Sequence, residues 1–198
     1  MLLTLAKEIG FSRVAEVDIH SLRAREEVRA LCAADRCGYY GKNWSCPPHA
    51  GEITALQRQL DRCVGGIVVE TTGELEDEFD LEGMGRIMQQ HSRSFAALAR
   101  QARLLYPKVL PLSAGPCTVC RRCTCPDRPC RFPRKRLSSM EAYGLLVSEV
   151  CRAAGLPYCS GSNTMTYISC ILIMQDETKK AGMDYGNTER TVSGTVEA

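Results

Sequence analysis

The sequence predicts a small layered α/β domain with about four strands, helices packed on the sheet, and two cysteine-rich metal loops. Segments with helical and strand periodicity alternate along the chain. Eight of the 12 cysteines fall in two short loop segments between these elements. A length of 198 residues suits one domain with a substantial core. We expect this domain to span residues 1–174, and residues 175–198 to form a polar, flexible tail.

The first half of the chain contains four expected elements. Partial alternation of apolar and polar residues over 11–19 predicts a strand. Residues 21–33 are expected to form a helix that ends at the first cysteine segment, where glycines and prolines predict a loop. A short helix at about 51–61 then leads into the β-branched strand G-I-V-V-E-T-T. The acidic stretch over 74–82 follows as an exposed loop.

The second half repeats the order of helix, strand, cysteine loop, helix and strand. Residues 83–105 have the apolar stripe of a long amphipathic helix, and K-V-L-P-L-S-A after it predicts a strand. Ser138 and Glu141 form an S-x-x-E capping box, which predicts a helix up to about Ala154. An apolar run over 164–174 predicts the final strand of the core.

The overall charge and hydropathy exclude some classes of partner. A net charge of +2 gives the whole chain no general attraction for nucleic acid. The first residues lack the basic segment of a secretory signal, and the longest apolar run, 168–174, is too short to span a bilayer. We therefore expect a cytoplasmic protein that binds neither membranes nor nucleic acid. Cysteines stay reduced in that compartment, so metal binding explains their clustering better than disulfide bonds.

The second cysteine segment, C-T-V-C-R-R-C-T-C-P-D-R-P-C, is the more specific of the two. Cys117, Cys120 and Cys123 have the C-x2-C-x2-C spacing that opens the bacterial ferredoxin run. Zinc sites more often use two separated C-x2-C pairs, so this spacing favours iron–sulfur over zinc. The fourth ligand is Cys130 or Cys125. Cys125 precedes a proline, and in ferredoxins the cysteine of such a pair binds the other cluster.

The first segment supplies three cysteines, at spacings x4 and x8: Cys32, Cys37 and Cys46. Two arrangements follow from this shortage. In one, Cys125 crosses over, and each cluster has four thiolates. In the other, Cys130 completes the second cluster, and one iron of the first binds water, His49 or a substrate as a Lewis acid.

The other four cysteines are expected to have no role in metal binding. Cys151 lies on the apolar face of a predicted helix and Cys170 in an apolar strand, so both are expected in the core, as is Cys63. Cys159 lies in a predicted loop. His91 falls on the apolar stripe of its helix, where a core histidine is more common than a ligand.

Three runs in the chain resemble a known family: Y-G-K-N-W-S-C-P-P, G-P-C-T-V-C-R-R-C followed by C-R-F-P, and S-M-E-A-Y-G. The family is a prokaryotic one described as predicted metal-binding proteins (domain of unknown function 2284). Its pattern covers these residues, with Cys32 as a further member: Cys37, Cys46, Cys117, Cys120, Cys123 and Cys130. Cys125 is an addition to that pattern, so the resemblance favours Cys130 as the fourth ligand of the second site.

Three functions follow from these patterns. The first is an iron–sulfur protein with two [4Fe–4S] clusters that transfers electrons to, or reductively activates, a partner protein. The second is an enzyme whose three-cysteine cluster binds a small substrate at an open iron. The third is a zinc protein with a structural, partner-binding role. Arginines between residues 121 and 136 are expected to balance the cluster charge, or else to bind an acidic redox partner.

Overall fold

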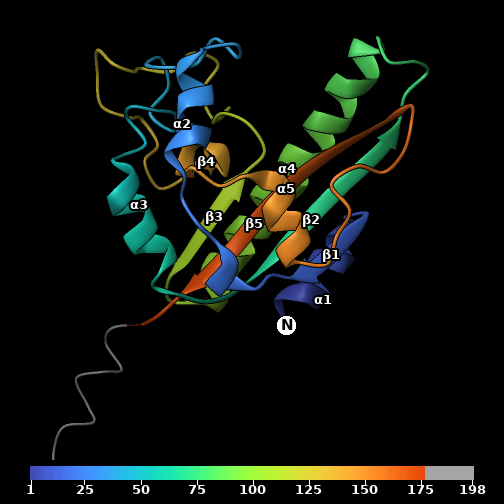
Figure 1. Cartoon of the computed structure of the whole chain (residues 1–198), viewed down its shortest axis with the longest axis horizontal. Coiled ribbons are helices and arrows are strands. Elements are labelled where there is room, and N and C mark those ends of the chain that lie inside the picture. Colours follow the sequence, from blue (N-terminus) through green and yellow to red (C-terminus); the bar gives the residue numbers. More distant parts are fainter. Residues whose placement is uncertain (177–198) are drawn as a thin grey trace, which may run out of the picture.

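A computed structural model describes residues 1–176, which form a five-stranded sheet in the order β1-β2-β5-β3-β4 (Figure 1). The strands are β1 (Arg13–Glu16), β2 (Cys63–Glu74), β3 (Val109–Ser113), β4 (Ser138–Ser139) and β5 (Thr164–Met174). Neighbouring strands are antiparallel, except that β3 and β4 run parallel. The α/β class is confirmed. The tail expected over 175–198 lies outside the described residues from 177 on.

Helices cover both faces of this sheet. They are α1 (Leu2–Ile9), α2 (Glu26–Ala33), α3 (Ile53–Leu60), α4 (Leu81–Leu105) and α5 (Val147–Ala153), with two 3₁₀ helices, η1 (Ile19–Ser21) and η2 (Glu141–Tyr143). Helices α1 and α4 pack on one face, and α3, α5 and η2 pack on the other. The arrangement is therefore a three-layer sandwich with the sheet in the middle.

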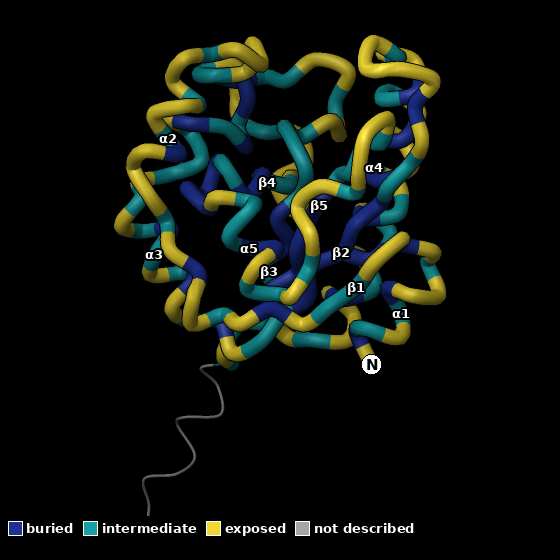
Figure 2. The backbone as a smooth tube through the Cα atoms, turned by 45° about the vertical axis from the view of Figure 1, so that its right-hand side comes forward, coloured by how far each residue is buried: buried dark blue, intermediate teal, exposed yellow. Residues whose placement is uncertain are grey.

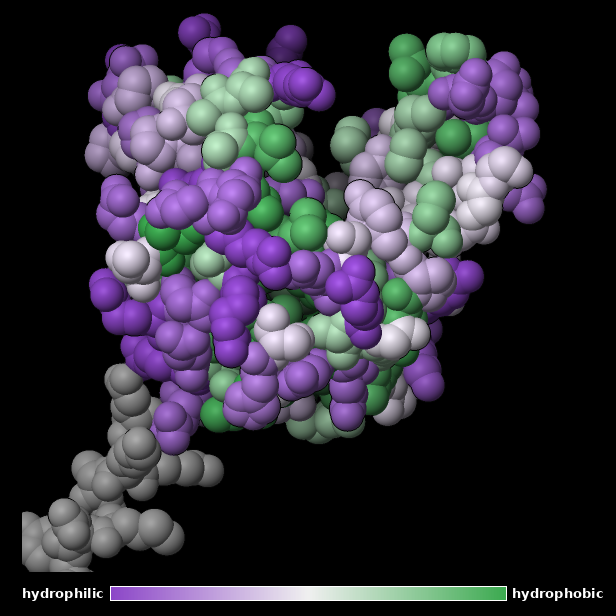
Figure 3. Space-filling view, viewed as in Figure 1, coloured by the Kyte–Doolittle hydropathy of each residue, from purple (hydrophilic) through white to green (hydrophobic). Residues whose placement is uncertain are grey.

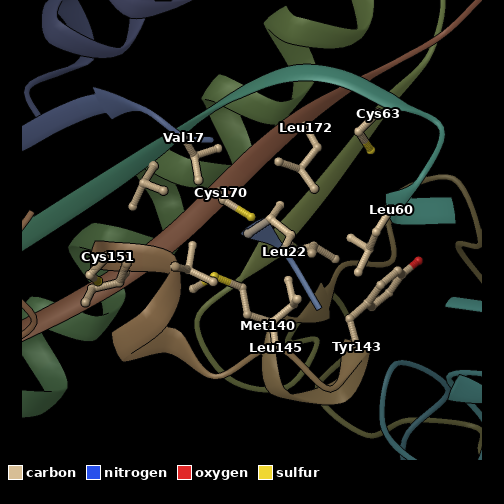
Figure 4. Packing of buried hydrophobic residues seen from close by; sticks show 14 of the residues in the cluster. Val17, Leu22, Leu60, Cys63, Met140, Tyr143, Leu145, Cys151, Cys170 and Leu172 are labelled. Carbon is tan, nitrogen blue, oxygen red and sulfur yellow. The ribbon is translucent and has the colours of Figure 1, made fainter. Parts of the chain in front are cut away.

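Along the central strands β2 and β5, buried side chains alternate between the two faces of the sheet, which explains why helices cover both faces. Ile67 and Val69 of β2 belong to the core under α1 and α4, whereas Val68 between them belongs to the opposite core. Residues alternate in this way because successive side chains of a strand point to opposite faces. In Figure 2 the buried segments accordingly gather along β2 and β5. The second core includes Cys170 and Met140, whose side chains lie close together in Figure 4.

The helix expected from Ser138 to about Ala154 is wrong in its first half, and its second half is confirmed by α5. Ser138 instead belongs to strand β4, and Glu141 begins the 3₁₀ helix η2. Gly144 ends η2 in the left-handed conformation, at φ +79°, and α5 starts only at Val147. The actual cap is made by Ser139, whose Oγ accepts a hydrogen bond of 3.1 Å from the Ala142 backbone N–H. A capping box is a local signal, and here packing against α2 selects a turn.

Helix α1 lies outside the elements expected from the sequence. Its buried residues are Leu2 and Ala6, four positions apart, which pack on the same face as α4. Gly10 ends the helix in the left-handed conformation at φ +94°. A pattern of eight residues is too short to distinguish a helix from a loop, and the helix is stabilised by its packing on the sheet.

Two long irregular segments meet beyond one end of the sheet. Residues 34–52 follow α2, and residues 114–137 follow β3, so both cysteine loops lie at the ends of regular elements as expected. With α2 they form the lobe at the upper left of Figure 3, which a notch separates from the start of α4. Connections of this length without secondary structure are uncommon in compact domains and usually functional. Among residues 1–176, no helix is both long and apolar enough to cross a membrane.

Candidate metal centre

The two cysteine loops are joined by hydrogen bonds into one unit. Asn43 donates from Nδ2 to the Cys117 carbonyl oxygen at 3.0 Å, and the Cys117 backbone N–H donates to Ser45 Oγ, also at 3.0 Å. Asn43 and Ser45 are both buried. Trp44 between them donates from Nε1 to the Arg128 carbonyl oxygen at 3.0 Å. Three successive residues of the first loop thus hold the second loop in place.

The first three cysteines line one cavity of about 540 Å³, which we call the three-cysteine cavity. Cys32 comes from the last turn of α2, and Cys37 and Cys46 come from the loop after it. The rest of the wall is largely apolar, and includes Leu31 and Leu146. Helix α2 and the segment before α5 therefore shape a space that all three thiols reach.

Four cysteines of the second loop line a separate cavity, which we call the four-cysteine cavity: Cys117, Cys120, Cys123 and Cys130. It is small, about 20 Å³, because the loop closes over the space between the thiols. Asn43 and Trp44 of the first loop complete its wall. The two cavities thus adjoin through residues 43–46.

Cys125 occupies a different position from the other candidate ligands. It is buried, and its Sγ donates a hydrogen bond of 3.5 Å to the carbonyl oxygen of Gly41. Within the described chain, Cys125 lines neither of the two cavities. His49 also lines neither cavity, and its ring packs edge-on to Trp44 with ring centroids 4.9 Å apart. Cys125 therefore has a local partner in Gly41, and His49 contacts the wall of the four-cysteine cavity through Trp44.

The thiols of the three-cysteine cavity influence one another. The pKa of Cys46 is raised to about 11, mainly by burial and in part by the nearby sulfurs of Cys37, Cys32 and Cys117, against a hydrogen bond from Ser45 that lowers it. Burial likewise raises the pKa of Cys32, as do Glu141 and Cys37. A bound metal reverses this effect because it stabilises the thiolate form.

The second loop carries arginines beside its cysteines, as its sequence suggests. Arg131 and Arg136 line the four-cysteine cavity. Arg131 donates from Nη1 to the Arg122 carbonyl oxygen at 3.0 Å, which ties the two ends of the loop together. Their positive charge suits a site that gathers thiolates.

Among residues 1–176, no three histidine, cysteine or carboxylate side chains meet at one point as ligands of a single ion do. The cysteines instead lie around two cavities. The core assignments are confirmed for Cys63, Cys151 and Cys170, which are buried, whereas Cys159 is exposed. His91 is also a core residue, with only 1% of its surface exposed.

Sequence reasoning missed three residues at this centre. Asn43 and Ser45 form an Asn-x-Ser turn before Cys46, in which Asn43 Oδ1 accepts hydrogen bonds of 3.0 Å from the backbone N–H and the hydroxyl of Ser45. Such turns are readable from sequence, but their partner Cys117 is not. Glu141 was assigned to a capping box and instead lines the three-cysteine cavity.

The comparisons with known proteins agree with this geometry. Residues 15–173 match the model of one family, whose description is "Predicted metal-binding protein (DUF2284)". No curated protein and no solved structure matches the chain. The matched residues include both cysteine loops and every strand except the last residue of β5 and the first two of β1. Because the match covers most of its length, the chain belongs to this family of predicted metal-binding proteins, DUF2284.

Proposed function

We propose that this protein holds two iron–sulfur clusters, one at each cavity, and transfers electrons through them to a partner protein. One observation carries the proposal: seven cysteines divide into a group of four and a group of three around two adjoining cavities. The proposed ligands are Cys117, Cys120, Cys123 and Cys130 at one site, and Cys32, Cys37 and Cys46 at the other.

The arrangement of the second group supports a cluster more than a single zinc ion. In a cubane each thiolate binds a different iron, so the sulfurs surround the cluster and need not meet at one point. Four cysteines around one cavity match that demand, and three of them have ferredoxin-like spacing. Since the cavity is small, the loop must open when the metal binds, as expected where metal binding is coupled to folding.

The closeness of the two sites supports electron transfer. Residues 43–46 run between the cavities, and the thiol of Cys46 is within electrostatic range of Cys117. When bound, the clusters would supply one-electron redox chemistry. The protein residues hold the loops, exclude water through Trp44 and balance charge through Arg131 and Arg136. The same arginines, in a reduced cytoplasmic setting, suit docking of an acidic redox partner.

An enzymatic role is the second candidate, and the three-cysteine cavity is the observation that favours it. This space of about 540 Å³ is larger than a cluster alone requires and is bordered by apolar side chains. An iron that lacks a cysteine ligand there would serve as a Lewis acid toward a small substrate.

Anaerobic reconstitution with iron and sulfide tests the proposal. We expect about eight iron and eight sulfide per chain, as two [4Fe–4S] clusters require, and broad visible absorbance. Cys120→Ser should lower the iron content by about half, because it removes a thiolate from one of two four-iron sites. Cys159→Ser, an exposed cysteine outside both groups, is the matched control and should keep full content. Stoichiometric zinc with no bound iron would contradict the proposal.

A further inference from the structure

We propose that the carboxylate of Glu141 is the fourth ligand of the metal cluster at the three-cysteine cavity, beside Cys32, Cys37 and Cys46. This inference rests on the proposed function, since it assigns the one position that the cysteines leave open. It makes the first site a mixed thiolate–carboxylate site, chemically distinct from the second.

The fold holds Glu141 beside the cysteines. Glu141 is the first residue of η2, which packs against α2, and the Glu141 carbonyl oxygen lies 4.0 Å from Cys32 Sγ. The Arg25 backbone N–H at the start of α2 donates to the Gly144 carbonyl oxygen at 2.8 Å, which fixes η2 against that helix. Glu141 also lines the same cavity as Cys32, Cys37 and Cys46. Four ligand-type side chains therefore border one space.

The side chain of Glu141 has an unused acceptor. Its Oε2 is buried, and no described residue forms a hydrogen bond with it. Burying a carboxylate oxygen without a partner costs several kcal/mol, so buried carboxylates are normally paired or coordinate metals. A buried carboxylate oxygen with no partner among residues 1–176 is available as a metal ligand.

A simple ion pair does not account for this carboxylate. Arg29 of α2, for example, donates from Nη1 to the carbonyl oxygens of Gly51 and Ala142, at 3.0 and 3.3 Å. Arg29 Nε is itself buried without a partner among the described residues. Iron of a cluster in this cavity would satisfy the carboxylate oxygen of Glu141, which lines it.

The other candidates for the fourth position do not line this cavity. Cys125 donates to the Gly41 carbonyl, the ring of His49 packs against Trp44, and Cys117 lines the four-cysteine cavity. Among the residues that border the three-cysteine cavity, Glu141 supplies the only carboxylate. Carboxylate oxygen is a harder ligand than thiolate, so the iron that it binds should be the most easily lost.

The test compares Glu141→Ala and Glu141→Cys with the wild-type protein after anaerobic reconstitution. Iron is counted, and electron paramagnetic resonance is recorded after mild oxidation. We expect Glu141→Ala to lose about one iron of about eight and to show the signal of a three-iron cluster. Glu141→Cys should keep all the iron and resist oxidation better than wild type. Glu149→Ala is the control, because Glu149 pairs with Arg25 at 2.7 Å outside the cavity.

The outcomes separate this inference from the proposed function. If Glu141→Ala is folded by circular dichroism and keeps the iron count and spectrum of wild type, Glu141 is not a ligand, although both clusters stand. If the alanine variant does not fold, unchanged oxygen sensitivity in Glu141→Cys would still overturn the assignment. If wild-type protein binds no iron, the proposed function itself fails.

Discussion

Burial shifts the pKa values of the core cysteines, which line neither of the two cavities. The pKa values of Cys63 and Cys151 are raised to about 11 by burial, and complete burial raises that of Cys170 still more. These thiols stay protonated at neutral pH and pack as small apolar groups, as their positions in Figure 4 show. Cys46 also has a raised pKa, but neighbouring sulfurs contribute to it. Clustering, more than burial, distinguishes the candidate ligands.

His91 connects the core to the second cysteine loop. Its ring nitrogens exchange hydrogen bonds with Thr71 Oγ1 at 2.9 Å and Ser169 Oγ at 2.7 Å. Ser169 Oγ in turn accepts a bond of 2.9 Å from the Ala114 backbone N–H, three residues before Cys117. The position of the loop thus depends on a neutral imidazole.

The first prediction concerns the pH dependence of His91. Burial lowers its pKa to about 4. Because the pKa in the folded protein lies below the unfolded value of about 6.5, His91 stabilises the fold fully above that value and less as pH falls toward 4. Between pH 7 and pH 4.5 we expect wild type to lose about 2–3 kcal/mol more unfolding free energy than His91→Gln, measured by urea denaturation. Equal losses would contradict the prediction, and exposed His20→Gln is the control.

At the scale of elements, the long patterns were predictable and the short turns were not. β2 and β5 are β-branched runs buried on both faces, and α4 has a long apolar stripe, so each has a strong local signal. The prediction for the segment after Ser138 is wrong because the conformation of this segment depends on Gly144. A glycine within S-M-E-A-Y-G is compatible with a helix, and its left-handed conformation arises from contact with α2.

The contact between η2 and α2 supports a second prediction. A Cβ on Gly144, at φ +79°, would lie 2.8 Å from the Arg25 backbone nitrogen. Gly155 is also left-handed, at φ +66°, but has open space around its Cβ position. We expect Gly155→Ala to cost about 1–2 kcal/mol through backbone strain alone, and Gly144→Ala to cost more and to release iron from the first site. Thermal unfolding and iron counts measure both, and equal effects would refute the role of this contact.

At the scale of the whole molecule, the sheet and the metal lobe are stabilised differently. The sheet rests on two apolar cores, whereas residues 34–52 and 114–137 form a lobe with little regular backbone hydrogen bonding. The tight lobe contacts are those of Asn43, Ser45 and Trp44. We infer that bound metal supplies much of the remaining order.

Removing the metal should therefore loosen one end of the protein only. In the metal-free protein we expect amide exchange to rise at least about tenfold across the two loops, which is about 1.4 kcal/mol of local stability. The centres of β2 and β5 serve as the internal control and should keep their protection. Hydrogen exchange with mass spectrometry makes the measurement. A uniform loss of protection across the sheet would contradict this division.

The sequence by itself determined the α/β class, the long elements, the core cysteines and the cysteines to be considered as ligands, because periodicity and spacing are local properties of the chain. It did not determine that the two cysteine loops meet. Their meeting depends on contacts between residues more than seventy positions apart, such as Asn43 with Cys117, which only the folded chain creates. Glu141 is the clearest case. Its neighbours in sequence suggest a helix cap, whereas the packing of η2 on α2 brings it to the cavity that Cys32 lines.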